Sequence, residues 1–155
     1  QLRSGQLTLN PVAVSDRYGE APFFEPPNPD HVSFSLVNFQ NGHVISTPHL
    51  TVKTIPIDHL FVGLESTVTV LKLDIEGAEI KALARLMSTA VRPDQILVEY
   101  DELATPSHAS VQHFKRTHES LLSQGYLPIY FDRRTCVSYV HASFIDYPKT
   151  RHQRR

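Results

Sequence analysis

The second half of the chain alternates short apolar runs with a helical pattern. Residues 68–73 (VTVLKL) and 95–100 (QILVEY) are compact apolar runs of strand length. Between them, apolar residues recur at the spacing of one helix face, at Ile80, Leu83, Ala84 and Met87. Two apolar strands joined by a helix are expected to be parallel neighbours in one sheet. This pattern predicts an α/β fold.

A second helix and a hairpin follow these strands. Ser107 is a suitable N-cap for a helix that runs to about residue 124, and Gly125 stands where a C-terminal glycine cap belongs. The apolar face of this helix is sparse, so we expect it on the outside of the sheet. The apolar runs 126–131 and 135–141 flank a polar turn, which predicts a β-hairpin that ends the sheet.

The first part of the chain is extended and rich in turns. Residues 7–15 indicate a strand entered through a proline, and the alternation over 32–37 indicates a half-buried strand. Four prolines within 21–30 predict an irregular surface loop. Residues 50–57 form another extended run, followed by a short helical turn from Asp58 to Leu60.

Composition narrows the class of protein. A chain of 155 residues is about one domain. Its formal net charge of −1 gives no sign of nucleic-acid binding, and its basic tail, 149–155, is typical of a solvated terminus. No apolar stretch approaches the roughly 18 residues that span a membrane, and no signal-peptide pattern is visible. With a single cysteine, Cys136, these features predict a cytoplasmic protein.

Acidic residues follow both predicted parallel strands. Asp74 and Glu76 come directly after the first, and Glu99 ends the second. Because ligands bind at the carboxyl ends of strands in open α/β sheets, these carboxylates are expected at one rim. Asp74 is either an N-cap with Glu76 beside the helix dipole, or part of a ligand site. A divalent metal held by carboxylate oxygens is a further alternative.

Other chemistry is weakly indicated. The nine histidines are scattered, and each is either a surface polar residue or, beside a substrate hydroxyl, a general base. The sequence has no P-loop, HExxH, paired CxxC or GxSxG motif. Its six glycines are too far apart to form a phosphate-binding loop.

The stretch 71–79 (LKLDIEGAE) resembles the KxDxEGxE signature of FkbM-type S-adenosylmethionine-dependent methyltransferases. Segments on both sides resemble the same family. They are 10–16 (NPVAVSD) with Gly19, 52–58 (VKTIPID) and 96–99 (ILVE). The resemblance covers roughly residues 7–131. It implies a Rossmann-like class I methyltransferase sheet with a C-terminal β-hairpin.

The resemblance also implies a reaction and roles for particular residues. The reaction is methyl transfer from S-adenosylmethionine to a hydroxyl of a small molecule or carbohydrate. Ser15 and Asp16 would contact the adenine end of the cofactor, and Asp74 would contact its methyl-bearing end. Asp74, Glu76 and Glu99 would be the catalytic or acceptor-side groups, whereas Lys72 would pair structurally. Segments 21–30 and 38–49 would face the acceptor.

One departure from the family pattern affects the expected activity. The family's first two strands, with the glycine-rich loop after the first and the acidic residue after the second, precede everything seen in this sequence. The chain is therefore expected to be a fragment, with a partial methyltransferase domain at 1–148 and a basic tail at 149–155. Two alternatives stay open: a non-catalytic α/β interaction module, and a metal-assisted hydrolase using Asp74, Glu76 and Glu99.

We predict that the isolated 155-residue chain binds S-adenosylmethionine very weakly or not at all, because the glycine-rich loop that grips the methionine part is missing. Calorimetric titration is the measurement. Micromolar affinity would contradict the prediction.

A thermal-shift scan with divalent metals tests the hydrolase alternative, since a bound metal stabilises the folded state by mass action.

Overall fold

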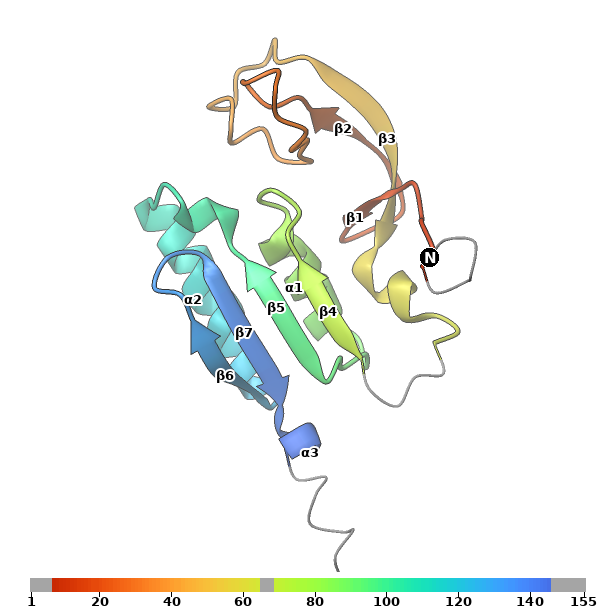
Figure 1. Ribbon diagram of the computed structural model, residues 1–155, viewed down its shortest axis with the longest axis vertical. Helices are drawn as coiled ribbons and strands as arrows, with labels where there is room; N and C mark the ends of the chain where they lie inside the picture. Colours follow the sequence, from red (N-terminus) through yellow and green to blue (C-terminus); the bar gives the residue numbers. More distant parts are fainter. Residues whose placement is uncertain (1–6, 65–68, 146–155) are drawn as a thin grey trace, which may run out of the picture.

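A computed structural model describes residues 7–64 and 69–145 of the chain. Its strands form two separate sheets, a lower one built from the second half of the chain and an upper one built from the first (Figure 1). The predicted basic tail, 149–155, and the first residue of the run 68–73 lie outside the described residues. The α/β fold class is confirmed, as two mixed sheets with helices.

The lower sheet has four strands in the order β4-β5-β7-β6. β4 (Val70–Leu73) and β5 (Gln95–Glu99) are parallel neighbours, which confirms the predicted pair. β7 (Cys136–His141) is antiparallel both to β5 and to β6 (Tyr126–Phe131). The predicted hairpin is therefore confirmed, and its second strand lies between its first strand and the parallel pair.

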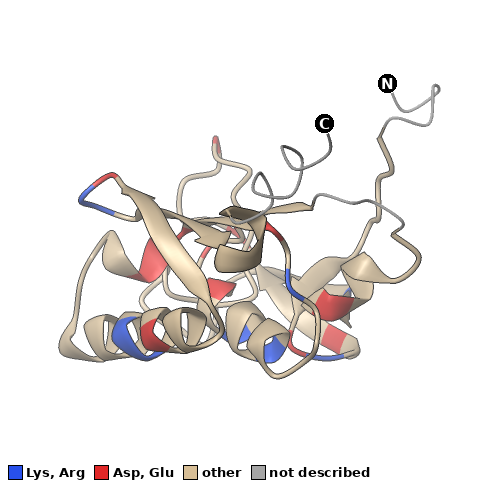
Figure 2. Cartoon of the chain, turned by 90° about the horizontal axis from the view of Figure 1, so that it is seen from below, with Lys and Arg blue, Asp and Glu red and all other residues tan. Residues whose placement is uncertain are grey.

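Helices α1 (Glu79–Met87) and α2 (His108–Ser123) run side by side on one face of the lower sheet (Figures 1 and 2). Their buried side chains and those of the strands form the core, which includes Leu73, Leu83, Leu86, Ile96, Tyr100, Leu121, Tyr126 and Tyr139. A short helix, α3 (Ala142–Ile145), follows the last strand. Within the described residues, no helix has the length and apolar character that crossing a lipid bilayer requires.

The ends of α2 match the caps predicted from the sequence. The Ser107 side chain accepts a hydrogen bond from the backbone N–H of Ser110, and the Ser110 hydroxyl oxygen accepts one from the backbone N–H of Ser107. This reciprocal pair satisfies two amides that have no partner inside the helix. Gly125 follows the helix at a φ of 88°, the left-handed conformation that glycine adopts without strain.

The upper sheet has three strands in the order β1-β3-β2. β1 (Ala13–Ser15) runs parallel to β3 (His49–Pro56), and β2 (Gly19–Phe24) runs antiparallel to it. A 3-10 helix, η2 (Ile57–Phe61), follows β3, as the sequence indicates. In Figure 1 this sheet curls above the carboxyl ends of β4 and β5.

Three expectations for the first third of the chain are wrong in part. The strand predicted over 7–15 is limited to its last three residues. The loop predicted over 21–30 begins as strand, because Pro22 lies in β2 at the edge of the sheet, where a missing N–H costs no ladder bond. The strand predicted over 32–37 is reduced to one bridge, between Ser35 and Phe24. The Ser35 hydroxyl accepts from the backbone N–H of Val37, a local bond that competes with an extended ladder.

We predict that Leu83→Ala lowers the free energy of unfolding by about 2–5 kcal/mol, because Leu83 is fully buried between α1 and the sheet. The matched control is Leu122→Ala on α2, where 42% of the side chain is already exposed, so a smaller loss is expected. Urea unfolding followed by circular dichroism measures both. Equal losses would show that α1 is not packed as described.

Candidate functional site

The site is built around the turn that joins β4 to α1, residues 74–78. Two successive residues of this turn are left-handed, Glu76 at a φ of 58° and Gly77 at 94°. The buried carboxylate of Glu79 holds the turn from below, since its Oε1 accepts hydrogen bonds from the backbone amides of Ile75 (2.8 Å) and Gly77 (3.2 Å). The N-cap of α1 is Ala78, which makes no side-chain cap. The alternative that Asp74 is the N-cap is therefore wrong.

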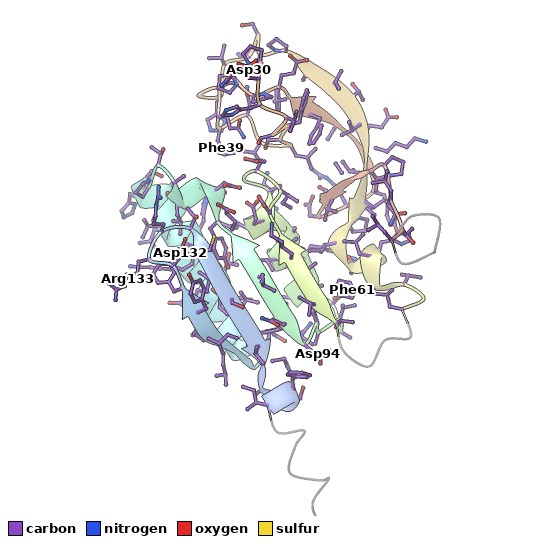
Figure 3. The ribbon with its side chains drawn as sticks, viewed as in Figure 1. Asp30, Phe39, Phe61, Asp94, Asp132 and Arg133 are labelled. Carbon is purple, nitrogen blue, oxygen red and sulfur yellow. The ribbon has the colours of Figure 1, made fainter. Side chains whose placement is uncertain are left out.

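The segment 35–40, which we call the docked segment, packs against this turn from the side of the upper sheet. The Ser35 hydroxyl donates to the backbone carbonyl of Glu76, and Gln40 Nε2 donates to Glu76 Oε2 at 3.0 Å. Figure 3 shows Phe39 reaching down from this segment toward the turn. A Cβ added to Gly77 would lie 2.8 Å from the Phe39 ring, so the docking needs glycine there.

Asp74 stands at the end of β4 with about two fifths of its side chain exposed. Lys72 Nζ pairs with Asp74 Oδ2 at 2.5 Å, and this hydrogen bond raises the pKa of Lys72. The pair is the structural role expected for Lys72. One carboxylate oxygen of Asp74 is thus engaged by a cation.

A cavity of about 410 Å³ lies between this turn and the upper sheet. Asp74 and Glu76 line one side of it. The other sides are lined mainly by apolar residues of β1, β2 and the segments next to them, including Val12, Val14, Phe23, Phe34 and Leu36. The Phe23 and Phe34 rings are stacked, with their centroids 5.6 Å apart. The cavity combines two carboxylates with an aromatic wall.

Ser15 and Asp16 line a different cavity, of about 160 Å³. The Ser15 hydroxyl donates to Asp16 Oδ1 at 3.0 Å, and Arg17 Nε lies 3.8 Å from the same oxygen. Leu36 lines this cavity as well as the larger one, so the two are neighbours. The predicted pair Ser15 and Asp16 therefore lines a cavity next to the one that Asp74 lines.

Glu99 lies at the carboxyl end of β5, on the same rim as Asp74, as the parallel register of the two strands requires. Its Oε1 accepts a long hydrogen bond of 3.4 Å from Thr135 Oγ1. It lines neither of the two cavities. In the described part of the chain, no three His, Cys, Asp or Glu side chains come together as a metal site. The carboxylate cluster expected for a metal-assisted hydrolase is thus not formed there.

A third cavity, of about 540 Å³, lies between the docked segment and the start of α2. Gln40, His43 and His113 line it, and His113 Nδ1 lies 3.4 Å from Glu102 Oε2 in the 3-10 helix η3 (Asp101–Leu103). Gln40 connects this cavity to Glu76. Phe39 and Gln40 lie in the segment 38–49 that the resemblance places on the acceptor side, but no periodicity or motif singles out either residue, nor His113 among the histidines.

Comparison with known proteins gives one match. The family model described as the methyltransferase FkbM domain matches residues 2–128, which include the turn and all three cavities. No curated protein and no solved structure matches the chain.

We predict that Gly77→Ala destabilises the protein more than Gly63→Ala. Both residues have positive φ, so each substitution costs about 1–2 kcal/mol of backbone strain. Only at Gly77 would the new Cβ also meet the Phe39 ring, since among the described atoms none lies within 4 Å of that position at Gly63. The clash adds about 1–3 kcal/mol.

Thermal unfolding of the two variants measures the difference. Adding Phe39→Leu to Gly77→Ala should recover part of the extra loss, because the smaller side chain leaves room for the methyl group. Equal destabilisation at both glycines would contradict the described docking of Phe39.

Proposed function

Because the chain belongs to the FkbM methyltransferase family, we propose that it transfers a methyl group from S-adenosylmethionine to a hydroxyl oxygen of a small molecule or carbohydrate. The observation that carries this proposal is the cavity of about 410 Å³ beside Asp74 and Glu76. Its volume lies within the usual range for small-molecule sites. It opens at the carboxyl end of β4, where open α/β sheets bind ligands.

The residues of this cavity fit parts of the cofactor. A sulfonium and an ammonium group are cationic, and the carboxylates of Asp74 and Glu76 favour positive charge nearby. The stacked pair Phe23 and Phe34 offers an apolar wall to a flat ring. We place the adenine end near Ser15 and Asp16, whose cavity adjoins across Leu36.

When bound, the cofactor supplies an electrophilic methyl group. The chain then has to orient the acceptor oxygen and remove its proton. We assign proton acceptance to Asp74, which stands at the rim and has one carboxylate oxygen not engaged by Lys72. Glu76 is held in place by Gln40 and would orient the acceptor.

The acceptor itself would occupy the cavity of about 540 Å³ at the start of α2. Its lining offers an aromatic ring from Phe39, an amide from Gln40 and two imidazoles, His43 and His113. Amide, imidazole and hydroxyl groups beside an aromatic ring suit a neutral acceptor with several hydroxyls. Because Gln40 also bonds Glu76, this cavity is connected to the turn where methyl transfer would occur. Glu99, on the same rim, is assigned to the acceptor side.

We further propose that the active form contains two more parallel strands, the first followed by a glycine-rich loop, between β1 and β4. Both strands are edge strands of their sheets, and no ladder joins them within the described residues. Val70 on β4 is 61% exposed, which is unusual for an apolar residue of a parallel strand. An open edge of this kind presents unpaired donors and acceptors to a further strand.

We predict that, in the whole protein, Asp74→Asn lowers kcat by about 100-fold or more, because an amide cannot accept the hydroxyl proton. Glu119→Gln, a neutralising change on the exposed surface of α2, is the control and should leave kcat unchanged. The assay follows methyl-labelled S-adenosylmethionine with a panel of monosaccharides and small hydroxylated compounds.

Two results would count against the proposal. Full activity of Asp74→Asn would remove Asp74 from the role of proton acceptor. Cofactor binding without transfer to any acceptor of the panel, in the whole protein, would favour the non-catalytic interaction module.

A further inference from the structure

A second carboxyl group lies beside the buried Glu79, within hydrogen-bonding reach of its carboxylate. It belongs to Asp101, the first residue of η3, which follows the carboxyl end of β5. Asp101 Oδ2 is buried and has no hydrogen-bond donor among the described residues. A buried carboxylate oxygen without a donor is costly, whereas a protonated carboxyl can itself donate.

If Asp101 is protonated, the carboxylate of Glu79 can accept a hydrogen bond from it. Glu79 is 1% exposed, and no Lys, Arg or His forms an ion pair with it within the described residues. Its carboxylate already accepts from the amides of Ile75 and Gly77, and hydrogen bonds from amides favour the ionised form. Of the two groups, Glu79 is therefore the one that stays ionised, and Asp101 is the one that holds a proton.

We propose that Asp101 and Glu79 share one proton, and that the resulting carboxyl–carboxylate hydrogen bond positions Glu79 beneath the turn 74–78. Asp101 is then a positioning residue, because it acts on the turn through Glu79. The proposal adds a function for two acidic residues that methyl transfer itself does not require. Its consequence for catalysis rests on the proposed function, whereas the hydrogen bond itself does not.

The electrostatic surroundings agree with this arrangement. Burial, followed by the charges of Glu79, Glu76 and Glu99, raises the pKa of Asp101 to about 7. The pKa of Glu79 is raised chiefly by burial, and its bonds to backbone amides and to Asp101 oppose that rise.

Neighbouring elements bring further titratable groups toward the pair. They are Tyr100, which follows β5, and Tyr139 on β7, whose hydroxyl is hydrogen-bonded to His118. Lys81, the cation nearest to Glu79 in sequence, is exposed on α1, and Lys72 and Arg85 are paired with Asp74 and Asp58. An acidic pair with acidic neighbours favours one retained proton over two negative charges.

If Asp101 lost this proton to water, two negatively charged carboxylates, those of Asp101 and Glu79, would repel each other inside the protein. Glu79 would then be pushed from the position in which it bonds both amides, and the turn that carries Asp74 and Glu76 would loosen. The geometry of the turn should therefore change as the pH rises through about 7, the pKa of Asp101.

Nuclear magnetic resonance of the 155-residue chain tests the proposal between pH 4 and 9. We expect the Asp101 carboxyl carbon to titrate near pH 7. The amide signals of Ile75 and Gly77 should shift with the same midpoint, because they report the hydrogen bonds to Glu79. Titration of Asp101 below about pH 5, near its ordinary value, would overturn the proposal. Amide signals that do not follow Asp101 would overturn its positioning role.

Two conservative variants separate the shared proton from a merely structural role. Asp101→Asn carries a permanent donor, so the Ile75 and Gly77 signals should stay at their low-pH positions throughout. Glu79→Gln can donate to the Asp101 carboxylate and should lower its midpoint by about one pH unit or more. Glu119→Gln is the exposed control and should leave both midpoints unchanged.

The outcome for Asp101→Asn is decisive even where Glu79→Gln does not fold. Amide signals of Asp101→Asn fixed at the high-pH positions of the wild type would overturn the proposal. If the proposed methyl transfer fails in every assay while these titrations agree, the carboxyl pair stands and only the proposed function falls.

Discussion

The structure depends on a backbone constraint at the end of β4. The chain must pass from a buried strand into α1 through two successive left-handed residues, Glu76 and Gly77. Such a turn directs backbone amides into the protein, where they need an acceptor. Glu79 supplies it from the first turn of the helix, and its own burial is tolerated because those amides stabilise its charge. Glu79, an acidic residue in the first turn of α1, thus supports the preceding turn from inside the protein.

The same turn connects the two halves of the molecule. No ladder joins the two sheets within the described residues, so the upper one is held to the lower one by side-chain contacts and by β1 lying against α1. Gly77 leaves room for Phe39, and the carbonyl and carboxylate of Glu76 bond Ser35 and Gln40. All three cavities border elements that meet at this point. A ligand between the halves would therefore contact the turn on one side and the upper sheet on the other.

Much of the lower half was predictable because its determinants are local. Ser107 and Gly125 satisfy the ends of α2 through atoms a few residues away, and the apolar runs of β4 and β5 are buried by the helix between them. The first third was less predictable. Pro22 is acceptable in a strand only because β2 is an edge, and Ser35 forms one bridge instead of a strand because its hydroxyl bonds Val37 and Glu76. Edge position and such contacts are not visible in a pattern of apolar residues.

The sequence by itself determined the α/β class, the parallel pair, the hairpin and the family, since periodicity, caps and the 71–79 motif are properties of short segments. It also placed Asp74 and Glu99 at one rim. Only the tertiary structure decided that Ser15 and Asp16 line a separate cavity and that His43 and His113, among nine histidines, line a large one. It also decided that Asp101 lies beside Glu79. The physical reason is distance along the chain. Gln40 and Glu76 are 36 residues apart, and Ser35 and Glu76 are 41 apart, so these residues come into contact only when the two sheets are assembled. The burial that raises the pKa of Asp101 likewise arises only in the folded protein.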